Sequence, residues 1–136
     1  MTWLLDTNVV SELRKGERAN PGIRSWFAQA EEDALYTSVL VVGELRRGIE
    51  LLRRRDVPSG LALDQWLASL IDGFANRILP VDQVVAERWG RLNVPDPVPT
   101  VDGLLAATAL VHGMTLVTRN TRDVARTGVA LLDPTS

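Results

Sequence analysis

Residues 3–13 read WLLDTNVVSEL, a stretch in which an apolar run passes into a helical pattern through a single carboxylate. Trp3, Leu4 and Leu5 have the character of a buried strand, and an apolar helical pattern resumes at Val9. An ionised carboxylate removed from water loses several kcal/mol of hydration unless a cation or hydrogen-bond donors meet it. The sequence therefore predicts that donors or a cation surround Asp6.

Outward from this stretch, short apolar runs alternate with amphipathic helical patterns. We expect strands at residues 3–5, 34–37, 77–79, 115–118 and 129–132. We expect helices at residues 9–15, around Trp26 and Phe27, after Ser38, around residues 63–70, after Asp82 and at residues 101–111. Pro58, Ser59 and Gly60 are expected to interrupt the helices, and residues 93–100 to form a loop. This alternation is typical of an α/β protein with a mostly parallel sheet covered on both faces.

Acidic residues from four separate segments are expected at one edge of this sheet. In open α/β sheets, ligands bind beyond the carboxyl ends of the strands, near the switch in strand order. Asp6 and Asp123 follow strands, and Asp102 begins a helix that leads back into one. Glu44 interrupts a helical stripe that is otherwise mainly apolar or small. Asn120 belongs to the same edge as Asp123.

Each acid also has a purely structural interpretation. Asp6 can cap the helix that follows it, and Asp102 can be a first-turn acid that favours the helix dipole. Asp123 can be a surface turn residue. The coincidence of all four acids on one edge favours a functional site, because carboxylates so placed repel one another unless a divalent cation joins them. Carboxylate oxygens without Cys or His favour Mg²⁺ or Mn²⁺ over Zn²⁺.

Length and composition are those of one ordinary globular domain, residues 1–136, with 46% hydrophobic and 24% charged residues. The absence of cysteine excludes disulfides and thiolate metal sites. With neither a signal-peptide pattern nor an apolar run of about 20 residues, we expect a cytoplasmic protein without membrane attachment. The net charge of −2 argues against a nucleic-acid partner, although arginines cluster at residues 46–55 and 119–126.

The strings LLDTNVVSEL, VVGELRRGIELL, ILPVDQVVAERWG, TVDGLLAATALVHGMTLVTRNTRDV and GVALLDP resemble those of PIN-domain ribonucleases, specifically the VapC toxins of type II toxin–antitoxin pairs. The resemblance runs almost end to end. It implies a three-layer α/β/α sandwich and places the metal-binding and catalytic acids at Asp6, Glu44, Asp102 and Asp123, with polar support from Thr7, Asn8, Thr118 and Asn120. One departure is Asp133-Pro134, where the family pattern has Asn-Pro.

The resemblance further implies Mg²⁺- or Mn²⁺-dependent hydrolysis of RNA to 5′-phosphate and 3′-hydroxyl ends. It also implies a VapB-type antitoxin as partner, with a homodimer, and a heterotetramer or larger assembly with the antitoxin. A metal-free ribonuclease would need paired general acid and base groups, usually histidines, and His112 is the only histidine. It lies near the end of a predicted helix, where a structural role is expected.

Two other classes of protein also gather acids at the edge of a parallel sheet. A receiver-like phosphoacceptor domain needs a lysine after a late strand, and the only lysine is Lys15. A non-catalytic module could use its acidic pocket to hold an arginine of a partner. A metal-binding titration separates that module from the nuclease.

Contacts with RNA and antitoxin are expected at further residues. Arg119, Arg122 and Arg126 surround Asp123 in the sequence and are candidates for holding RNA phosphates. The acidic pocket itself is a bidentate target for an arginine of the antitoxin. Trp26 and Phe27 could hold an antitoxin helix, or could simply pack in the core.

Overall fold

The computed structural model describes residues 1–135, and at its centre lies a sheet of five strands. The strands are β1 (Trp3–Leu5), β2 (Leu35–Ser38), β3 (Ile78–Leu79), β4 (Thr115–Val117) and β5 (Leu131–Leu132). Their order in the sheet is β3-β2-β1-β4-β5, and every neighbouring pair is parallel. The prediction of a mostly parallel sheet is confirmed.

Seven α-helices lie within the described residues. They are α1 (Thr7–Leu13), α2 (Pro21–Gln29), α3 (Val39–Arg53), α4 (Val57–Phe74), α5 (Gln83–Leu92), α6 (Thr100–His112) and α7 (Thr121–Val124). Short 3₁₀ segments occupy Gly16–Arg18, Glu32–Ala34, Ala75–Arg77 and Ala125–Thr127.

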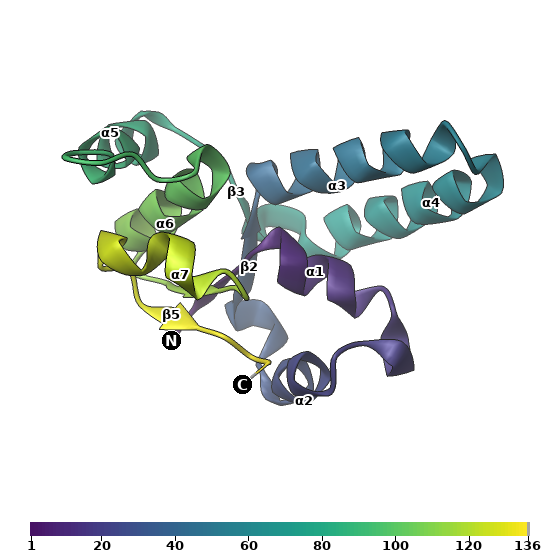
Figure 1. The fold of residues 1–136 in the computed structure, drawn as a ribbon. Helices are drawn as coiled ribbons and strands as arrows, with labels where there is room; N and C mark the ends of the chain where they lie inside the picture. The colour runs from purple at the N-terminus through teal and green to yellow at the C-terminus, as the bar shows by residue number, and fades with distance from the viewer. Residues whose placement is uncertain (136) are drawn as a thin grey trace.

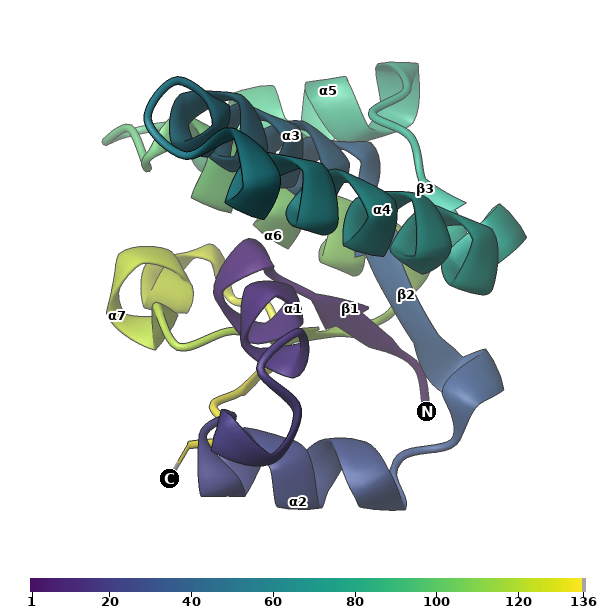
Figure 2. The ribbon, with the colours of Figure 1, turned by 90° about the vertical axis from the view of Figure 1, so that its right-hand side faces the viewer.

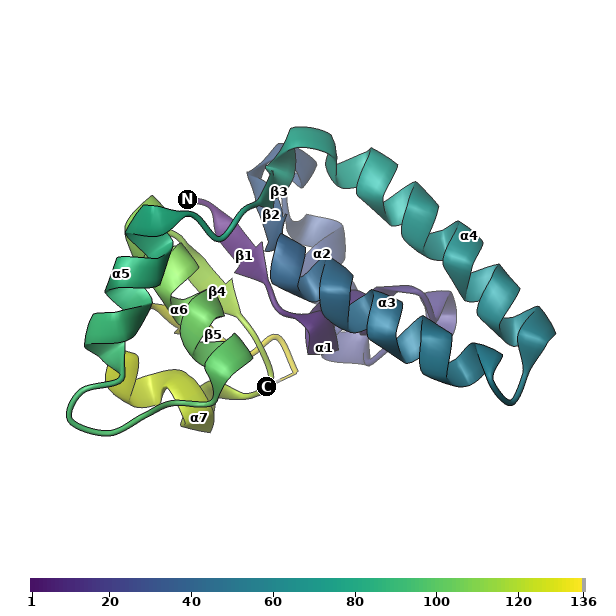
Figure 3. The ribbon, with the colours of Figure 1, turned by 90° about the horizontal axis from the view of Figure 1, so that it is seen from above.

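The helices cover both faces of the sheet. Figure 1 shows α5 and α6 on one side of the strands and α1, α3 and α4 on the other, and the view from above in Figure 3 shows the same division. Figure 2 shows α2 at the end of the molecule near the C-terminus. The expected three-layer α/β/α sandwich is therefore confirmed.

The middle of the sheet is buried on both faces, which explains why its strands are continuous apolar runs. Leu4, Leu5 and Val117 are completely buried, and Leu116 is nearly so. Helix α6 is buried along most of its length, including Leu105 through Ala109, so the apolar pattern all around it is explained by its position between α5 and the sheet.

The strand order switches between β1 and β4. From β1 the chain moves outward through β2 to β3, and it then crosses to the other side of β1 to form β4 and β5. The carboxyl ends of β1 and β4 are therefore the place where a ligand-binding crevice is expected in such a sheet. Asp6 follows β1 directly, and Thr118 follows β4.

Two predicted helix caps are confirmed. The hydroxyl of Ser38 accepts a hydrogen bond from the Leu40 amide at 3.0 Å and starts α3. The carboxylate of Asp82 accepts one from the Val85 amide at 2.9 Å and starts α5. Helix α1 begins two residues earlier than expected, at Thr7, because Asp6 itself caps it.

The predicted break at Pro58, Ser59 and Gly60 is wrong. These residues form the first turn of α4, whose N-cap is Asp56, and the break lies between Arg53 and Val57. Proline is tolerated in a first helical turn because no intrahelical partner awaits its missing amide proton. The Asp56 carboxylate accepts hydrogen bonds from the amide and the hydroxyl of Ser59 at 3.1 and 2.7 Å.

Within residues 1–135, none of the helices combines the length and the apolar character needed to cross a membrane.

Arg77 joins the segments that precede β2 and β3. Its guanidinium donates to the carbonyl oxygens of Glu32, Leu35 and Gly73 at 2.6, 2.5 and 2.9 Å, and it lies over the ring of Phe74 at 5.3 Å. Hydrogen bonds from a charged group are stronger than neutral ones, so Arg77 ties these segments together through three carbonyl groups.

Replacing Arg77 by Met is expected to lower the free energy of unfolding by about 2 kcal/mol, because the methionine keeps much of the side-chain volume but loses three hydrogen bonds from a charged donor. Urea unfolding measures this loss. The exposed Arg91→Met is the control and should change stability by less than about 0.5 kcal/mol. Equal stability of the two variants would contradict the assigned role of Arg77.

Candidate functional site

Asp6 is a buried carboxylate at the switch in strand order. Its side chain is 5% exposed. One oxygen accepts a hydrogen bond from the Thr7 amide at 2.6 Å, and the other accepts one from the Thr118 hydroxyl at 2.7 Å. Burial raises the pKa of Asp6, and these two hydrogen bonds oppose that rise. The donors that the sequence required around Asp6 are thus supplied by α1 and by the end of β4.

The backbone around Asp6 is fixed as well. The Asp6 amide donates to the Val117 carbonyl at 3.0 Å, and the Thr37 hydroxyl donates to the Leu5 carbonyl at 3.0 Å. Both neighbouring strands, β4 and β2, therefore hold the end of β1 in place.

A polar network extends from Asp6 to the segment after β4. The Asn8 side-chain amide lies 3.5 Å from Asp6 Oδ2 and 3.4 Å from Thr118 Oγ1. Its oxygen accepts from the Arg119 amide at 3.2 Å, and Thr118 Oγ1 accepts from the Asn120 amide at 2.9 Å. The four polar residues assigned by resemblance thus lie together, and three of them order the loop that leads to α7.

Glu44 reaches the same region from α3. Its carboxylate accepts a hydrogen bond from the Thr7 hydroxyl. Glu44 is exposed, whereas its place in a mainly apolar or small stripe indicated that it is not an ordinary solvent-facing glutamate. Thr7 therefore links α1 to α3 at the mouth of the site.

Asp102 lies in the first turn of α6 and faces the other acids. Burial raises its pKa from 3.8 to about 6, with further contributions from the negative charges of Asp6, Asp123 and Glu44. Like charges in proximity disfavour the ionised form of a carboxyl group. The repulsion expected from the sequence is thus present at Asp102, and it involves all four acids.

Three of the four acids line one open cleft of about 440 Å³. Its lining comes from α1, α3, α6 and the start of α7: Asp6, Thr7, Asn8, Ser11, Glu44, Arg47, Gly48, Asp102 and Asn120. Asp123 is exposed on α7 and does not line this cleft, although its charge acts on Asp102. Asp123 therefore belongs to the rim of the site.

The donor set fits a hard divalent cation, because it consists of carboxylate, hydroxyl and amide oxygens without nitrogen or sulfur ligands. Within residues 1–135, no three of these acids are already gathered closely enough to hold a metal ion. Mg²⁺ keeps several waters and is usually bound by one or two carboxylates together with substrate phosphates.

A second, more apolar groove of about 510 Å³ continues from the cleft between α1, α3 and α4. It shares Thr7, Ser11, Glu44 and Gly48 with the cleft. Its other lining residues are Arg14, Leu45, Ile49, Leu52, Arg55, Leu63 and Trp66. The sequence did not reveal this groove, because α3 and α4 are separate amphipathic helices whose pairing only the folded chain shows.

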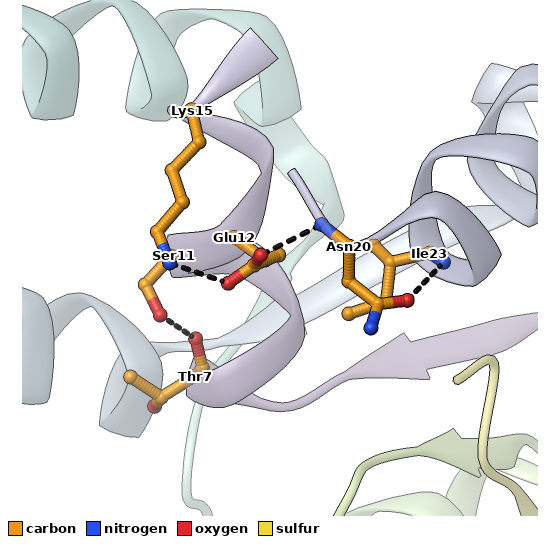
Figure 4. A network of polar contacts seen from close by, with 6 residues as sticks. All are labelled: Thr7, Ser11, Glu12, Lys15, Asn20 and Ile23. Atoms are coloured by element: carbon orange, nitrogen blue, oxygen red, sulfur yellow. Dashed lines mark hydrogen bonds and ion pairs between the residues drawn. The ribbon is translucent and has the colours of Figure 1, made fainter. Parts of the chain in front are cut away.

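The position of α1 along this groove is set by a short polar network, drawn in Figure 4. Glu12 accepts hydrogen bonds from Lys15 Nζ at 3.0 Å and from the Asn20 amide at 2.7 Å. The Ser11 hydroxyl donates to the Thr7 carbonyl at 2.7 Å, and Asn20 caps α2 through the Ile23 amide at 3.1 Å. The pKa of Glu12 is lowered, mainly by the hydrogen bond from Lys15. Glu12 is therefore assigned a structural role.

The three arginines around Asp123 differ in their surroundings. The Arg126 guanidinium donates to the Asp96 carbonyl and so ties the loop before α6 to the segment after α7. The positive charge of Arg119 contributes to lowering the pKa of both Glu12 and Asp133. Arg122 is exposed on α7.

Other residues singled out in the sequence lie away from the acids. His112 is exposed in the last turn of α6, at the opposite end of that helix from Asp102. The Trp26 ring packs edge-on against Trp3 at 5.5 Å between ring centroids and contacts the core. Phe27 is 36% exposed. Core packing is thus the observed role of Trp26.

Comparison with known proteins agrees with this geometry. Residues 3–129 match the model of the PIN domain family. The toxin FitB of Neisseria gonorrhoeae is 33% identical, with 96% of each chain covered. The VapC ribonuclease Y4jK of Sinorhizobium fredii is 30% identical, also with 96% of each covered. The crystal structure of FitAcB from Neisseria gonorrhoeae has a TM-score of 0.90 at 32% identity, with 98% of each chain covered.

Further solved structures of lower identity share the fold, and they are described as a toxin–antitoxin complex from Klebsiella pneumoniae and as DNA-bound VapBC from Salmonella typhimurium. The match to the family model covers nearly the whole chain, and the relatives match it over almost their full length. This chain therefore belongs to the PIN domain family.

Proposed function

We propose that this protein is a metal-dependent endoribonuclease and the toxin of a VapBC-type toxin–antitoxin pair. It hydrolyses RNA phosphodiester bonds and leaves 5′-phosphate and 3′-hydroxyl ends. The observation that carries the proposal is the convergence of Asp6, Glu44 and Asp102 on one open cleft, where burial and the charges of the other three acids raise the pKa of Asp102. The relatives named ribonuclease and toxin support the same activity.

In this proposal Asp6, Glu44, Asp102 and Asp123 hold Mg²⁺ or Mn²⁺ and are the catalytic residues. When bound, the cation supplies a Lewis acid for the phosphoryl group and a lowered pKa for the attacking water. Hydrogen bonds from the Thr7 amide and the Thr118 hydroxyl fix both oxygens of Asp6 and oppose the rise of its pKa that burial causes. Burial and the charges of the other three acids raise the pKa of Asp102 to about 6.

Thr7, Asn8, Thr118 and Asn120 act as polar support. Thr7 orients Glu44, and Thr118 orients Asp6. Asn8 and Thr118 hold the amides of Arg119 and Asn120, and this fixes the start of the segment that carries Asp123. Orientation of acidic ligands by neighbouring donors is typical of metal sites.

A histidine-based route is not supported. His112 and Asp102 are ten residues apart on α6, which corresponds to about 15 Å along the helix axis. The receiver-like alternative also lacks support, because Lys15 lies beyond the end of α1 and is paired with Glu12 at 3.0 Å.

The proposed partner is a VapB-type antitoxin. A segment of it seated in the apolar groove between α1, α3 and α4 would place an arginine next to Glu44 and Asp102, because groove and cleft share part of their lining. Such an arginine blocks substrate and offsets the charge of the acids together. A homodimer of this chain, and a heterotetramer or larger assembly with the antitoxin, complete the proposal.

Among the arginines nominated from the sequence, Arg122 is the best candidate for an RNA phosphate contact. It shares its helical turn with Asp123, whereas Arg119 and Arg126 interact with groups of this chain.

Incubation of the purified protein with total RNA and Mg²⁺ or Mn²⁺, followed by mapping of 5′-phosphate ends, tests the activity. The variant Asp102→Asn is expected to abolish cleavage, while its melting temperature in EDTA stays unchanged or rises because one repelling charge is gone. Asp72→Asn, an exposed acid on α4, is the matched control and should cleave like the wild type. Full activity of Asp102→Asn would contradict the proposed role of the acids.

The pH dependence of stability gives a second prediction. A group whose pKa is raised in the folded protein stabilises the fold below its unfolded pKa, and this contribution is lost as the pH rises through the folded value. In EDTA, wild type and Asp102→Asn should therefore melt similarly near pH 4, and the wild type should fall below the variant as the pH rises through about 6. A difference in melting temperature between wild type and variant that does not change with pH would refute this prediction.

The antitoxin is expected to be encoded by a short open reading frame directly upstream. Co-expression should give a complex that co-purifies and cleaves no RNA, and replacing one arginine of the partner by methionine should restore cleavage. Gel filtration measures formation of the complex, and RNA digestion measures the cleavage. Absence of such a frame, together with harmless overexpression of this protein alone, would count against the toxin assignment.

A further inference from the structure

Arg47 differs from Arg46 and Arg53, the other arginines of α3, in having no ion pair within the described residues. Arg46 pairs with Asp64 at 2.7 Å and with Glu50 at 3.5 Å, and Arg53 pairs with Glu50 at 3.6 Å. Arg47 lines the acidic cleft, yet within residues 1–135 no carboxylate lies within 4.0 Å of its guanidinium nitrogens. Its positive charge is therefore available to something outside the chain.

Gly48, the next residue, has no structural reason in the described chain to be a glycine. It lies inside α3, where glycine is less favourable than alanine, and its φ is not positive. A Cβ atom built on it would meet no atom within 4 Å. Neither packing nor backbone geometry therefore requires the missing side chain.

The position of Gly48 offers a functional reason for the absence of a side chain. Gly48 lines both the acidic cleft and the adjoining groove, so it forms the passage between them together with Thr7, Ser11 and Glu44. A helix surface without a side chain lets the backbone of a ligand approach closely. Arg47 stands beside this passage on the side of the acids.

We infer that Arg47 and Gly48 form a subsite for a backbone phosphate of the RNA strand, next to the phosphate that is cleaved. The strand crosses α3 over Gly48 while Arg47 pairs with the phosphate. This inference rests on the proposed ribonuclease function and names part of its substrate site.

The charges favour RNA over a protein segment at this point. A phosphodiester strand that enters a cleft with three carboxylates is repelled, and an unpaired guanidinium at the rim offsets this repulsion. The antitoxin arginine proposed above pairs with Glu44 and Asp102, whereas the like charge of Arg47 favours a phosphate at its own position on the rim. The experiment must therefore distinguish RNA from a protein ligand at Gly48.

The test measures binding of a fluorescein-labelled single-stranded RNA in EDTA, without cleavage, by anisotropy at several salt concentrations. For Arg47→Ala, we expect the slope of log K against log salt to shrink by about 0.7, the value for loss of one phosphate contact to a single strand. Arg47→Lys should keep the slope. Arg46→Ala is the matched control, because it removes the same charge from the neighbouring, ion-paired position.

A second pair of variants tests the passage. Gly48→Ala should raise the melting temperature, since alanine favours the helix, and yet weaken RNA binding severalfold. Gly90→Ala in α5, where a Cβ also meets no atom within 4 Å, should raise the melting temperature and leave RNA binding unchanged.

The outcomes separate this subsite from the proposed function. If the wild type binds RNA but cuts none with Mg²⁺ or Mn²⁺, the proposed activity fails, and the binding comparison still decides on the subsite. Equal slopes for Arg47→Ala and Arg46→Ala, or unchanged RNA binding by Gly48→Ala, overturn the inference. Weaker binding of the antitoxin but not of RNA by Gly48→Ala also overturns it, in favour of a protein ligand. Absence of RNA binding by the wild type overturns both.

Discussion

The burial of one carboxylate, Asp6, at the carboxyl end of β1 is the constraint on which the site depends. Its position is possible because the strand order switches between β1 and β4, which brings the Thr118 hydroxyl within 2.7 Å of it. The amide of Thr7 supplies the second donor and at the same time starts α1. A single desolvated charge thus couples the sheet topology, the first helix and the loop after β4.

The remaining acids around Asp6 differ in how deeply they are buried. Asp102 is half-buried and its pKa is raised to about 6, whereas Glu44 and Asp123 are exposed at the mouth. Mutual repulsion of this kind lowers the stability of the fold, and the divalent cation proposed for this site would relieve it. The open spacing of the acids would leave room for waters and for a substrate phosphate around the proposed ion.

The strands and caps were predictable because they depend on local chemistry. The caps Ser38 and Asp82 and the apolar runs of β1 and β4 need only neighbouring residues to be recognised. Pro58 was misread because a proline in a first helical turn and a proline that ends a helix look alike in sequence. The apolar groove beside the acids, the tie between Arg126 and the Asp96 carbonyl, and the unpaired state of Arg47 depend on contacts between distant segments, which the pattern of residues does not encode locally.

The central claim is that these carboxylates bind a divalent cation, and the most direct measurement is the electron paramagnetic resonance signal of free Mn²⁺ during titration with the protein. It should be made alone and with a single-stranded DNA oligonucleotide that supplies phosphates. The account predicts saturable loss of the free Mn²⁺ signal, reversal by excess Mg²⁺, and much weaker binding by a variant that combines Asp6→Asn with Asp102→Asn. A free Mn²⁺ signal that stays unchanged in both titrations, or equal binding by wild type and variant, would contradict it.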